Sequence, residues 1–205
     1  MSRHGKVMVA MSGGIDSTVV ALMLHEQGYE VIGITMKTWD YASSGSSSKE
    51  TGCCSLDSIN DARALAVSYG FPHYILDIRE EFGNFVIDNF VEEYLAGRTP
   101  NPCVLCNTHI KWEALLKRAN MLDCEFIATG HYARTEHGQL YEGIDTNKDQ
   151  SYFLWTLTQE QLAFTLLPVG DSPKATIREE AHKKGLITAE KKDSQGICFL
   201  GQVDI

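Results

Sequence analysis

The sequence predicts an α/β fold built around a parallel, doubly wound sheet. Short apolar runs of β type alternate with stretches of helical periodicity along most of the chain, which is typical of consecutive βαβ units. A glycine-rich turn joins the first run to the first helix, at a position where sheets of this kind bind ligands. The 205 residues are 43% hydrophobic and 22% charged, and this composition excludes general disorder.

The predicted elements follow one another along the chain. Strands are expected at residues 6–11, 30–36, 73–77 and 126–129, with a further β segment at 139–144. Helices are expected at residues 17–27, 56–69, 81–95, 108–120, 158–166 and 173–184. Gly28 and Gly70 follow two of these helices, where a glycine commonly ends a helix.

The predicted helix at 81–95 carries apolar residues at helical spacing, which indicates one buried face. These residues are Phe82, Phe85, Val86, Phe90 and Tyr94.

Composition also limits the partners and the compartment. No apolar run reaches about 18 residues, and the first residues are too glycine-rich for a signal peptide, so we expect a cytoplasmic protein without membrane contact. Six cysteines without an export signal predict reduced thiols. The net charge of -9 has the wrong sign for holding nucleic acid by bulk electrostatics, so such a partner needs local basic patches. The lysines and arginines at 170–205 are interpreted first as a solvated helix face.

The residues MSGGIDST at 11–18 lie between the first predicted strand and the first helix. Backbone N–H groups and the helix dipole bind an anion at such a turn. Gly13 and Gly14 let the backbone close around a phosphate, and the hydroxyls of Ser12 and Ser17 add donors. The turn is neither GxxxxGK[ST] nor GxGxxG. A capped turn without a ligand is the alternative, but SGGxDS after a first strand favours phosphate binding.

This loop resembles that of the PP-loop, or N-type, ATP pyrophosphatases. Members of that superfamily cleave ATP between the α and β phosphates and pass AMP to a carbonyl oxygen. The resemblance implies a Rossmann-like domain of the adenine nucleotide alpha hydrolase-like type, with ATP and Mg²⁺ as cofactors. Magnesium would offset the charge that develops on pyrophosphate, and Asp16 is the side chain expected to orient it.

Cys103 and Cys106 form a CxxC just before the helix predicted at 108–120. Cys106 is expected at or beside the N-terminus of that helix, where the pKa of a thiol is lowered and the thiolate is favoured. Cys198 lies far along the chain, and only the fold can join it to the CxxC. Half of a zinc site is the alternative, but a tetrahedral site needs four ligands and the other cysteines do not form a second CxxC.

Four further blocks narrow the resemblance. They are GRTPNPCVLCNTHIKW at 97–112, ATGHYAR at 128–134, KDQSYFL at 148–154 and KKDSQGICF at 191–199. Together with the loop they resemble the tRNA-specific 2-thiouridylases, in the order of that family. Its members convert the wobble uridine, position 34 of the tRNAs for Lys, Glu and Gln, to 2-thiouridine, using ATP and sulfur from a carrier protein or cysteine desulfurase.

The resemblance implies a role for each matching residue. Cys198 is expected to carry the persulfide, and Cys106 to be the nucleophile that closes a transient disulfide with it. The target base is expected to lie against Asn101, Pro102 and Cys103, and the tRNA against Lys148, Asp149 and Gln150. ATP is expected to lie on Ala10, Met11, Ser12, Gly13, Gly14, Ile15, Asp16, Ser17, Met36 and Gly130.

The chain departs from the family pattern in two ways. Many members have Asp at the position of Cys103, and Cys103, Cys106 and Cys198 together would also suit a [4Fe-4S] cluster with one open iron. The sequence leaves both a persulfide relay and an iron–sulfur cluster open, and it favours the persulfide relay. Family members also continue into a larger central domain and a C-terminal β-barrel. We therefore expect a PP-loop domain at 1–168, the start of a central tRNA-binding domain at 169–205, and no β-barrel.

Two other functions are compatible with the loop. An amide-forming PP-loop ATP pyrophosphatase acting on a small acid would share the ATP site but would not need Cys106 and Cys198. A non-enzymatic adenine-nucleotide-binding module would bind ATP without releasing AMP in response to tRNA.

Overall fold

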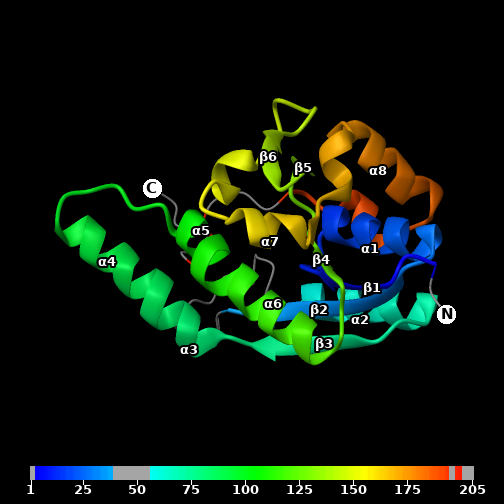
Figure 1. The fold of residues 1–205 in the computed structure, drawn as a ribbon, viewed down its shortest axis with the longest axis horizontal. Helices are drawn as coiled ribbons and strands as arrows, with labels where there is room; N and C mark the ends of the chain where they lie inside the picture. Colours follow the sequence, from blue (N-terminus) through cyan, green and yellow to red (C-terminus); the bar gives the residue numbers. More distant parts are fainter. Residues whose placement is uncertain (1–2, 39–55, 194–196, 200–205) are drawn as a thin grey trace.

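The computed structural model describes residues 3–38, 56–193 and 197–199. Its centre is a five-stranded parallel sheet in the order β3-β2-β1-β4-β7 (Figure 1). The strands are β1 (Lys6–Ala10), β2 (Glu30–Lys37), β3 (His73–Asp77), β4 (Phe126–Ala128) and β7 (Thr165–Leu166). The chain adds β2 and β3 on one side of β1 and returns to the other side for β4, so the strand order reverses at β1. The predicted α/β class with a parallel, doubly wound sheet is confirmed.

Helices cover both faces of this sheet. One face carries α1 (Ile15–Gln27), α2 (Leu56–Tyr69) and α8 (Lys174–Lys183), and the other carries α6 (Trp112–Met121) with α7 (Gln159–Ala163). Successive residues of β1 point to opposite faces, as the pleat of a strand requires. Val7 and Val9 pack in the core with α1, whereas Met8 packs in the core with α6. No helix in the described part of the chain is both long and apolar enough to cross a membrane.

The α8 helix packs in the same core as α1, because Ile177 and Ala181 contact that cluster. The core therefore continues past residue 168 into α8. The domain boundary expected there stays a prediction. Smaller elements surround the sheet: the antiparallel hairpin β5 (Ala133–Glu136) and β6 (Gln139–Glu142), and the 3-10 helices η4 (Ser151–Leu154), η5 (Pro168–Asp171) and η6 (Ile187–Glu190).

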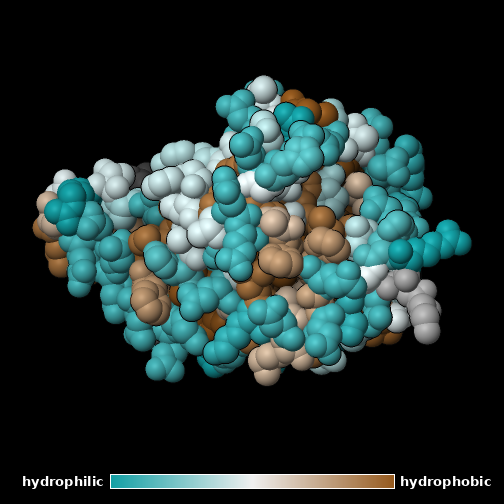
Figure 2. Space-filling view, viewed as in Figure 1, coloured by the Kyte–Doolittle hydropathy of each residue, from teal (hydrophilic) through white to brown (hydrophobic). Residues whose placement is uncertain are grey.

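A helical arm leads away from the sheet edge (Figure 1). It consists of α3 (Arg79–Phe82), the π-helical segment η2 (Gly83–Ile87) and α4 (Asp88–Leu95). The helix is where the sequence predicts it, but the predicted buried face is partly wrong. Phe85 and Tyr94 are 57% and 58% exposed, while Phe82 is fully buried. The π turn adds a residue to the helical repeat, so an apolar stripe with a period of 3.6 loses its phase there. Hydrophobic side chains accordingly reach the surface along α4 in Figure 2.

The helix predicted at 108–120 begins earlier than expected. Its first turn is α5 (Pro102–Leu105), followed by the π-helical segment η3 (Cys106–Lys111) and then α6. Asn101 is the N-cap, and its side-chain oxygen accepts a hydrogen bond from the Val104 N–H at 3.3 Å. Cys106 therefore lies one turn inside the helix, and its expected position at the N-terminus is wrong.

The helix predicted at 158–166 ends early. Thr158 caps α7 through a capping box with Gln161, but α7 stops at Ala163. The next residues form β7, which pairs with β4 and completes the sheet. Trp112 stabilises this strand, because its indole N–H donates to the Thr165 hydroxyl at 2.9 Å. Pairing with a distant strand outweighs a helical pattern that is only local.

Candidate functional site

A cavity of about 400 Å³ opens at the carboxyl ends of β1 and β4, where the strand order reverses. This is the position at which parallel α/β sheets bind ligands. Every residue expected to hold the nucleotide lines the cavity, except Gly13. The lining includes Ala10, Met11, Ser12, Gly14, Ile15, Asp16, Ser17, Met36 and Gly130.

The turn between β1 and α1 is shaped by its glycines and serines. Gly13 has a φ of +67°, and a Cβ there would lie 2.1 Å from the Ser58 carbonyl oxygen, so only glycine fits. The Ser12 N–H donates to the Ser17 hydroxyl oxygen at 3.1 Å and closes the turn. Gly14 is the N-cap of α1 and provides no side-chain cap. The first turn of α1 therefore offers backbone donors and a positive helix end to an anion.

Gly130 brings the end of β4 against the start of α1. A Cβ at this position would lie 2.9 Å from the Ser17 nitrogen and 3.0 Å from the Asp16 Cβ. Both distances are shorter than ordinary van der Waals contact. The absence of a side chain at Gly130 therefore keeps the β4 side of the cavity close to the phosphate loop.

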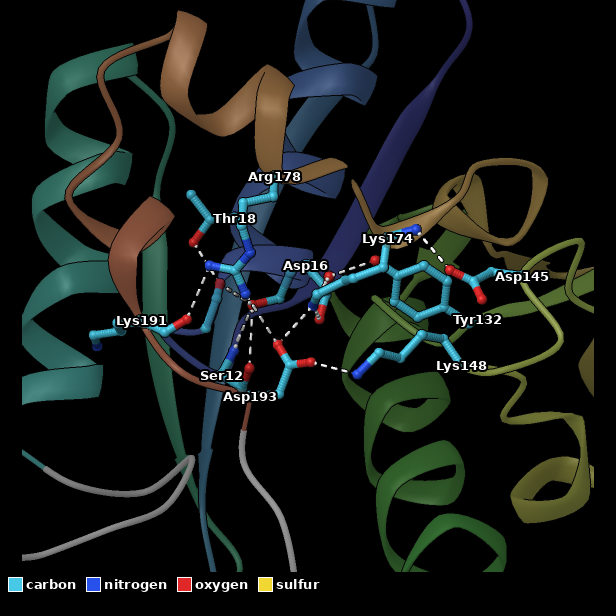
Figure 3. Close-up of polar contacts among 12 residues, drawn as sticks. Ser12, Asp16, Thr18, Tyr132, Asp145, Lys148, Lys174, Arg178, Lys191 and Asp193 are labelled. Atoms are coloured by element: carbon cyan, nitrogen blue, oxygen red, sulfur yellow. Dashed lines mark hydrogen bonds and ion pairs between the residues drawn. The ribbon is translucent and has the colours of Figure 1, made fainter. Parts of the chain in front are cut away.

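Asp16 is bound by two side chains from later parts of the chain (Figure 3). The Lys174 ammonium lies 2.7 Å from both carboxylate oxygens, and the Tyr132 hydroxyl donates to one of them at 2.7 Å. Burial of Tyr132 and the negative charge of Asp16 raise the pKa of the Tyr132 hydroxyl, so it stays protonated and donates. Lys174 is only 8% exposed, so its interpretation as part of a solvated face is wrong.

The ion pair with Lys174 occupies the carboxylate that is expected to bind magnesium. Mg²⁺ takes oxygen ligands, commonly one or two carboxylates together with phosphates and water. Asp16 lines the cavity and supplies such oxygens, but both of them already contact Lys174. Asp16 as a magnesium ligand therefore stays a prediction in which the ion competes with Lys174.

Cys106 and Cys198 lie against the same hydrophobic cluster. Cys106 is buried in it with Phe82, Val86 and their neighbours, and Cys198 is half-buried and packs against it. Met36 also packs against this cluster and at the same time lines the cavity. The fold therefore places the two distant cysteines against one cluster, and this cluster meets the cavity at Met36.

The third cysteine is placed differently. Cys103 is half-buried one turn before Cys106 and is not a member of the cluster that holds the other two. Within residues 3–38, 56–193 and 197–199, no three His, Cys, Asp or Glu side chains are grouped as metal ligands. The [4Fe-4S] alternative therefore stays a prediction, and we derive no step through such a cluster.

Two of the three residues expected to contact tRNA line the cavity. Lys148 and Gln150 line the cavity, and the Gln150 side-chain oxygen accepts from the Tyr132 N–H at 3.0 Å. Asp149 has a local structural role, because its carboxylate accepts from the Gly143 N–H and the Ser151 hydroxyl at 2.8 and 2.7 Å.

His131 also lies on the wall and is hydrogen-bonded through Nδ1 to the Thr129 hydroxyl at 2.8 Å. Burial, followed by the positive charge of Lys111, lowers the pKa of His131 below its ordinary value. The imidazole is therefore neutral near pH 7 and suited to hydrogen bonding rather than to ion pairing.

The chain matches the family described as "tRNA methyl transferase HUP domain" over residues 5–202. This chain belongs to that HUP-domain family. It is 65% identical over 98% of its length to the tRNA-specific 2-thiouridylase MnmA of Amoebophilus asiaticus, covering 55% of that protein. It is 63% identical over its whole length to the MnmA of Cytophaga hutchinsonii, covering 57% of it. The kinship inferred from the motifs is confirmed, and the chain spans about half the length of these relatives.

Solved structures share the fold of this HUP-domain chain at low identity. An NMN synthetase from Francisella tularensis superimposes with a TM-score of 0.56 at 15% identity, over 98% of this chain and 70% of its own. A 4-thiouridine synthetase in complex with RNA and bound ATP superimposes with a TM-score of 0.54 at 19% identity, over 91% of this chain and 42% of its own. Both likenesses concern the fold alone.

Sequence reasoning missed three residues of this HUP-domain site: Tyr132, Lys174 and Asp193. Tyr132 and Lys174 bind Asp16, and Asp193 lines the cavity and pairs with Lys174 at 3.0 Å. One signal was present for Lys174. It shares the buried face of α8 with Ile177 and Ala181, at a spacing of three and then four residues.

Proposed function

We propose that this chain carries the ATP and sulfur chemistry of a tRNA 2-thiouridylase. The observation that carries the proposal is the packing of Cys106 and Cys198 against one cluster, which shares Met36 with the cavity behind the phosphate loop. High identity to proteins named tRNA-specific 2-thiouridylase supports it. An ATP enzyme without sulfur transfer has no need of two thiols beside its nucleotide site.

The first step activates the substrate. The phosphate loop and the start of α1 bind the phosphates of ATP, and the uridine O2 attacks the α-phosphorus. An O–P bond forms, the bond to the β-phosphate breaks, and pyrophosphate leaves. The C2 carbonyl of uridine is urea-like and its oxygen is a poor leaving group, so adenylation is what makes that oxygen leave as AMP. Magnesium, when bound, supplies positive charge for the departing pyrophosphate.

The second step transfers sulfur. A persulfide on Cys198 attacks C2, and AMP leaves with the former O2. The thiolate of Cys106 then attacks the Cys198 sulfur, which breaks the S–S bond and leaves the terminal sulfur on C2. The product is 2-thiouridine with a Cys106–Cys198 disulfide, which a thiol reductant restores to two thiols. We favour this relay over a cluster because Cys106 and Cys198 pack against one hydrophobic cluster of which Cys103 is not a member.

Residues suited to contact RNA lie in the cavity and at the start of α5. Lys111, Lys148 and Lys192 line the cavity, so a chain with a net charge of -9 still offers local positive charge to a phosphate backbone. Asn101, Pro102 and Cys103 lie at the start of α5, one turn from Cys106, where a flipped base can approach the thiol. We propose position 34 of the tRNAs for Lys, Glu and Gln as the target, with a sulfur carrier or cysteine desulfurase as the donor in the cytoplasm.

Thiolation by the purified protein tests the proposal directly. The protein is incubated with ATP, Mg²⁺, a persulfide donor and unmodified tRNA, and AMP and 2-thiouridine are measured by nucleoside mass spectrometry. We expect thiolation to fall by at least about 100-fold in both Cys106→Ser and Cys198→Ser, because each removes a reacting sulfur. Cys124→Ser is the matched control, because Cys124 packs beside the core of α6. Thiolation that persists without Cys198 contradicts the sulfur route.

An amide-forming ATP pyrophosphatase remains the second candidate, because an NMN synthetase has the same fold. That reaction uses the phosphate loop but neither cysteine. Release of AMP with a small carboxylic acid, and unchanged turnover in the Cys106→Ser, Cys198→Ser double variant, would favour it over thiolation. A nucleotide-binding module without enzymatic activity would bind ATP and release no AMP in either assay.

A further inference from the structure

The backbone of Met11, at the start of the phosphate loop, is bound by a buried hydroxyl of the neighbouring strand. Thr35 on β2 is 1% exposed, and its hydroxyl donates to the Met11 carbonyl oxygen at 2.8 Å. The Met11 N–H donates to the Ile34 carbonyl oxygen at 2.8 Å. Both polar backbone atoms of Met11 are therefore held by consecutive residues of β2.

The peptide group between Met11 and Ser12 is fixed at both of its polar atoms. Thr35 binds its carbonyl oxygen, and its N–H, which belongs to Ser12, donates to the Ser17 hydroxyl oxygen at 3.1 Å. A peptide group is planar, so these two bonds together set its orientation. Gly13 and the start of α1 follow directly and supply the backbone N–H groups that an anion needs. The orientation of this peptide group therefore bears on where those donors point.

His73 on β3 fixes the direction in which the Thr35 hydroxyl donates. The His73 Nε2 atom lies 2.8 Å from the Thr35 hydroxyl oxygen. A carbonyl oxygen can only accept, so the single proton of the hydroxyl goes to Met11, and the hydroxyl must accept from His73. The imidazole therefore carries a proton on Nε2. The bonds run in one direction, from His73 through Thr35 to Met11.

The other ring nitrogen of His73 favours the neutral imidazole. Nδ1 is buried and has no hydrogen-bond partner within the described part of the chain. A second proton there would be buried without an acceptor, which is costly. Burial, followed by the positive charge of Arg63, lowers the pKa of His73 below its ordinary value. His73 is therefore neutral near pH 7 and has one ring donor, which Thr35 accepts.

Gly33 provides the space for this arrangement. It lies opposite His73 in the register of β2 and β3, two residues before Thr35 and on the same face of β2. A Cβ at Gly33 would lie 2.7 Å from the Met11 sulfur and 3.0 Å from the His73 Cδ2 atom. The side chains of Met11 and His73 therefore both approach a position that has no side chain of its own.

We infer that Thr35 is a positioning residue for the phosphate loop and that His73 orients its hydroxyl. The inference rests on the proposed function for the nucleotide site. Neither residue lines the cavity, so both act on the loop through Met11 rather than on a ligand. A loop whose first peptide group is already fixed does not have to be ordered when the phosphates bind, and such preorganisation favours affinity.

Nucleotide affinity in a Thr35→Val variant tests the positioning role, because valine keeps the shape of threonine and removes the hydroxyl. The affinity for a non-hydrolysable ATP analogue is measured by titration calorimetry on the wild type and on the variant. We expect the variant to bind at least about 5-fold more weakly, because the peptide group after Met11 loses one of its two restraints. Thr35→Ser should bind within about 2-fold of the wild type, because serine keeps the hydroxyl.

Thr165→Val is the matched control. Thr165 is also buried, accepts from a ring N–H, that of Trp112, and donates to a backbone carbonyl oxygen, that of Gln161. Both valine variants should therefore unfold at a lower urea concentration than the wild type, but only Thr35→Val should lose nucleotide affinity. An equal loss of affinity in both variants, or no loss in Thr35→Val, means that the hydroxyl is merely structural and overturns the inference.

Adenosine separates the phosphate loop from the rest of the nucleotide site. It has no phosphates, so we expect its affinity, measured by NMR titration, to change by less than about 2-fold in Thr35→Val. A loss for adenosine as large as the loss for the ATP analogue would show a defect beyond the phosphate loop, and it would contradict the inference.

A second variant keeps the inference testable if Thr35→Val does not fold. In His73→Phe the aromatic ring is kept but cannot donate to Thr35, so we expect the ATP analogue to bind at least about 2-fold more weakly. Unchanged affinity in that variant then overturns the inference. If the wild type binds no adenine nucleotide, the proposed function fails and the inference fails with it. If the wild type binds the analogue and the variants bind it equally well, only the inference fails.

Discussion

The ammonium nitrogen of Lys174 lies 2.7 Å from each carboxylate oxygen of Asp16, across 158 residues of sequence. Replacement of Lys174 by Met keeps most of the side-chain volume but leaves Asp16 without its cation. We expect Lys174→Met to lower the free energy of unfolding by about 2 to 4 kcal/mol, because breaking one side of a buried ion pair strands a charge. Urea unfolding followed by circular dichroism measures this loss.

Lys183→Met is the control for this experiment. Lys183 lies on the same helix and pairs with Glu180 on the exposed surface, so its loss should leave the unfolding midpoint unchanged. Equal stability of the Lys174→Met variant and the wild type would show that Asp16 does not depend on the pair.

A side chain at Gly130 should close the gap between β4 and α1. In Gly130→Ala the new Cβ would lie 2.9 Å from the Ser17 nitrogen, so the phosphate loop has to shift. We expect nucleotide affinity to fall by at least about 10-fold, because a displacement of the donors in a preorganised site is costly. Gly83→Ala is the matched control, since a Cβ there meets nothing within 4 Å and alanine favours a helix. Calorimetric titration with an ATP analogue compares the two, and equal affinities would contradict the prediction.

The placement of the cysteines predicts which pair oxidises. Under a mild oxidant we expect a Cys106–Cys198 disulfide, because both side chains lie against one cluster. Tryptic peptides analysed by mass spectrometry without reduction identify the linkage. Cys103→Ser should leave the cross-link intact. A dominant Cys103–Cys106 bond, or linkage to Cys124, would argue against the proposed relay.

The pH dependence of stability should report on Asp193. Burial alone would raise its pKa, but hydrogen bonds from Lys148 and Lys174 together with their charges hold it below the ordinary value of 3.8 in the folded state. A lowered pKa contributes stability that is fully present above the unfolded value and is lost as the pH falls through the folded value. Below about pH 4 the wild type should therefore lose more unfolding free energy than Asp193→Asn. The difference should be about 1 kcal/mol or less, because Asp193 is partly exposed. Urea midpoints from pH 7 to pH 3 measure it, and parallel curves would refute it.

The sheet and the phosphate loop were predictable because their signals are local. The apolar run of β1, the glycines of the turn and the periodicity of α1 lie within residues 6–27, and the structure has these elements almost where the pattern indicates. The same holds for α2 and β3, whose bounds agree with the prediction. Each of these segments keeps one hydrophobic pattern, either helical or β, along its whole length, and its tertiary contacts agree with that pattern.

The sequence-based predictions were wrong where residues distant in the chain determine the secondary structure or the burial of a side chain. Thr165 continues a helical pattern locally but pairs with β4, and Lys174 has the composition of a surface lysine but binds Asp16. The π turn in η2 disturbs the helical period at Phe85, which is exposed, and the early start of the helix at Pro102 explains the inner position of Cys106. None of these contacts is visible in a window of neighbouring residues.

The pairing of Asp16 with Lys174 also has a consequence for synthesis. The phosphate loop emerges from the ribosome early, but the cation that neutralises its acidic residue is translated 158 positions later. At about 5 to 20 residues per second, the carboxylate is without that partner for roughly 8 to 30 s. The nascent loop therefore passes through an interval in which its charge is balanced only by solvent and ions, and the completed site is a late product of translation.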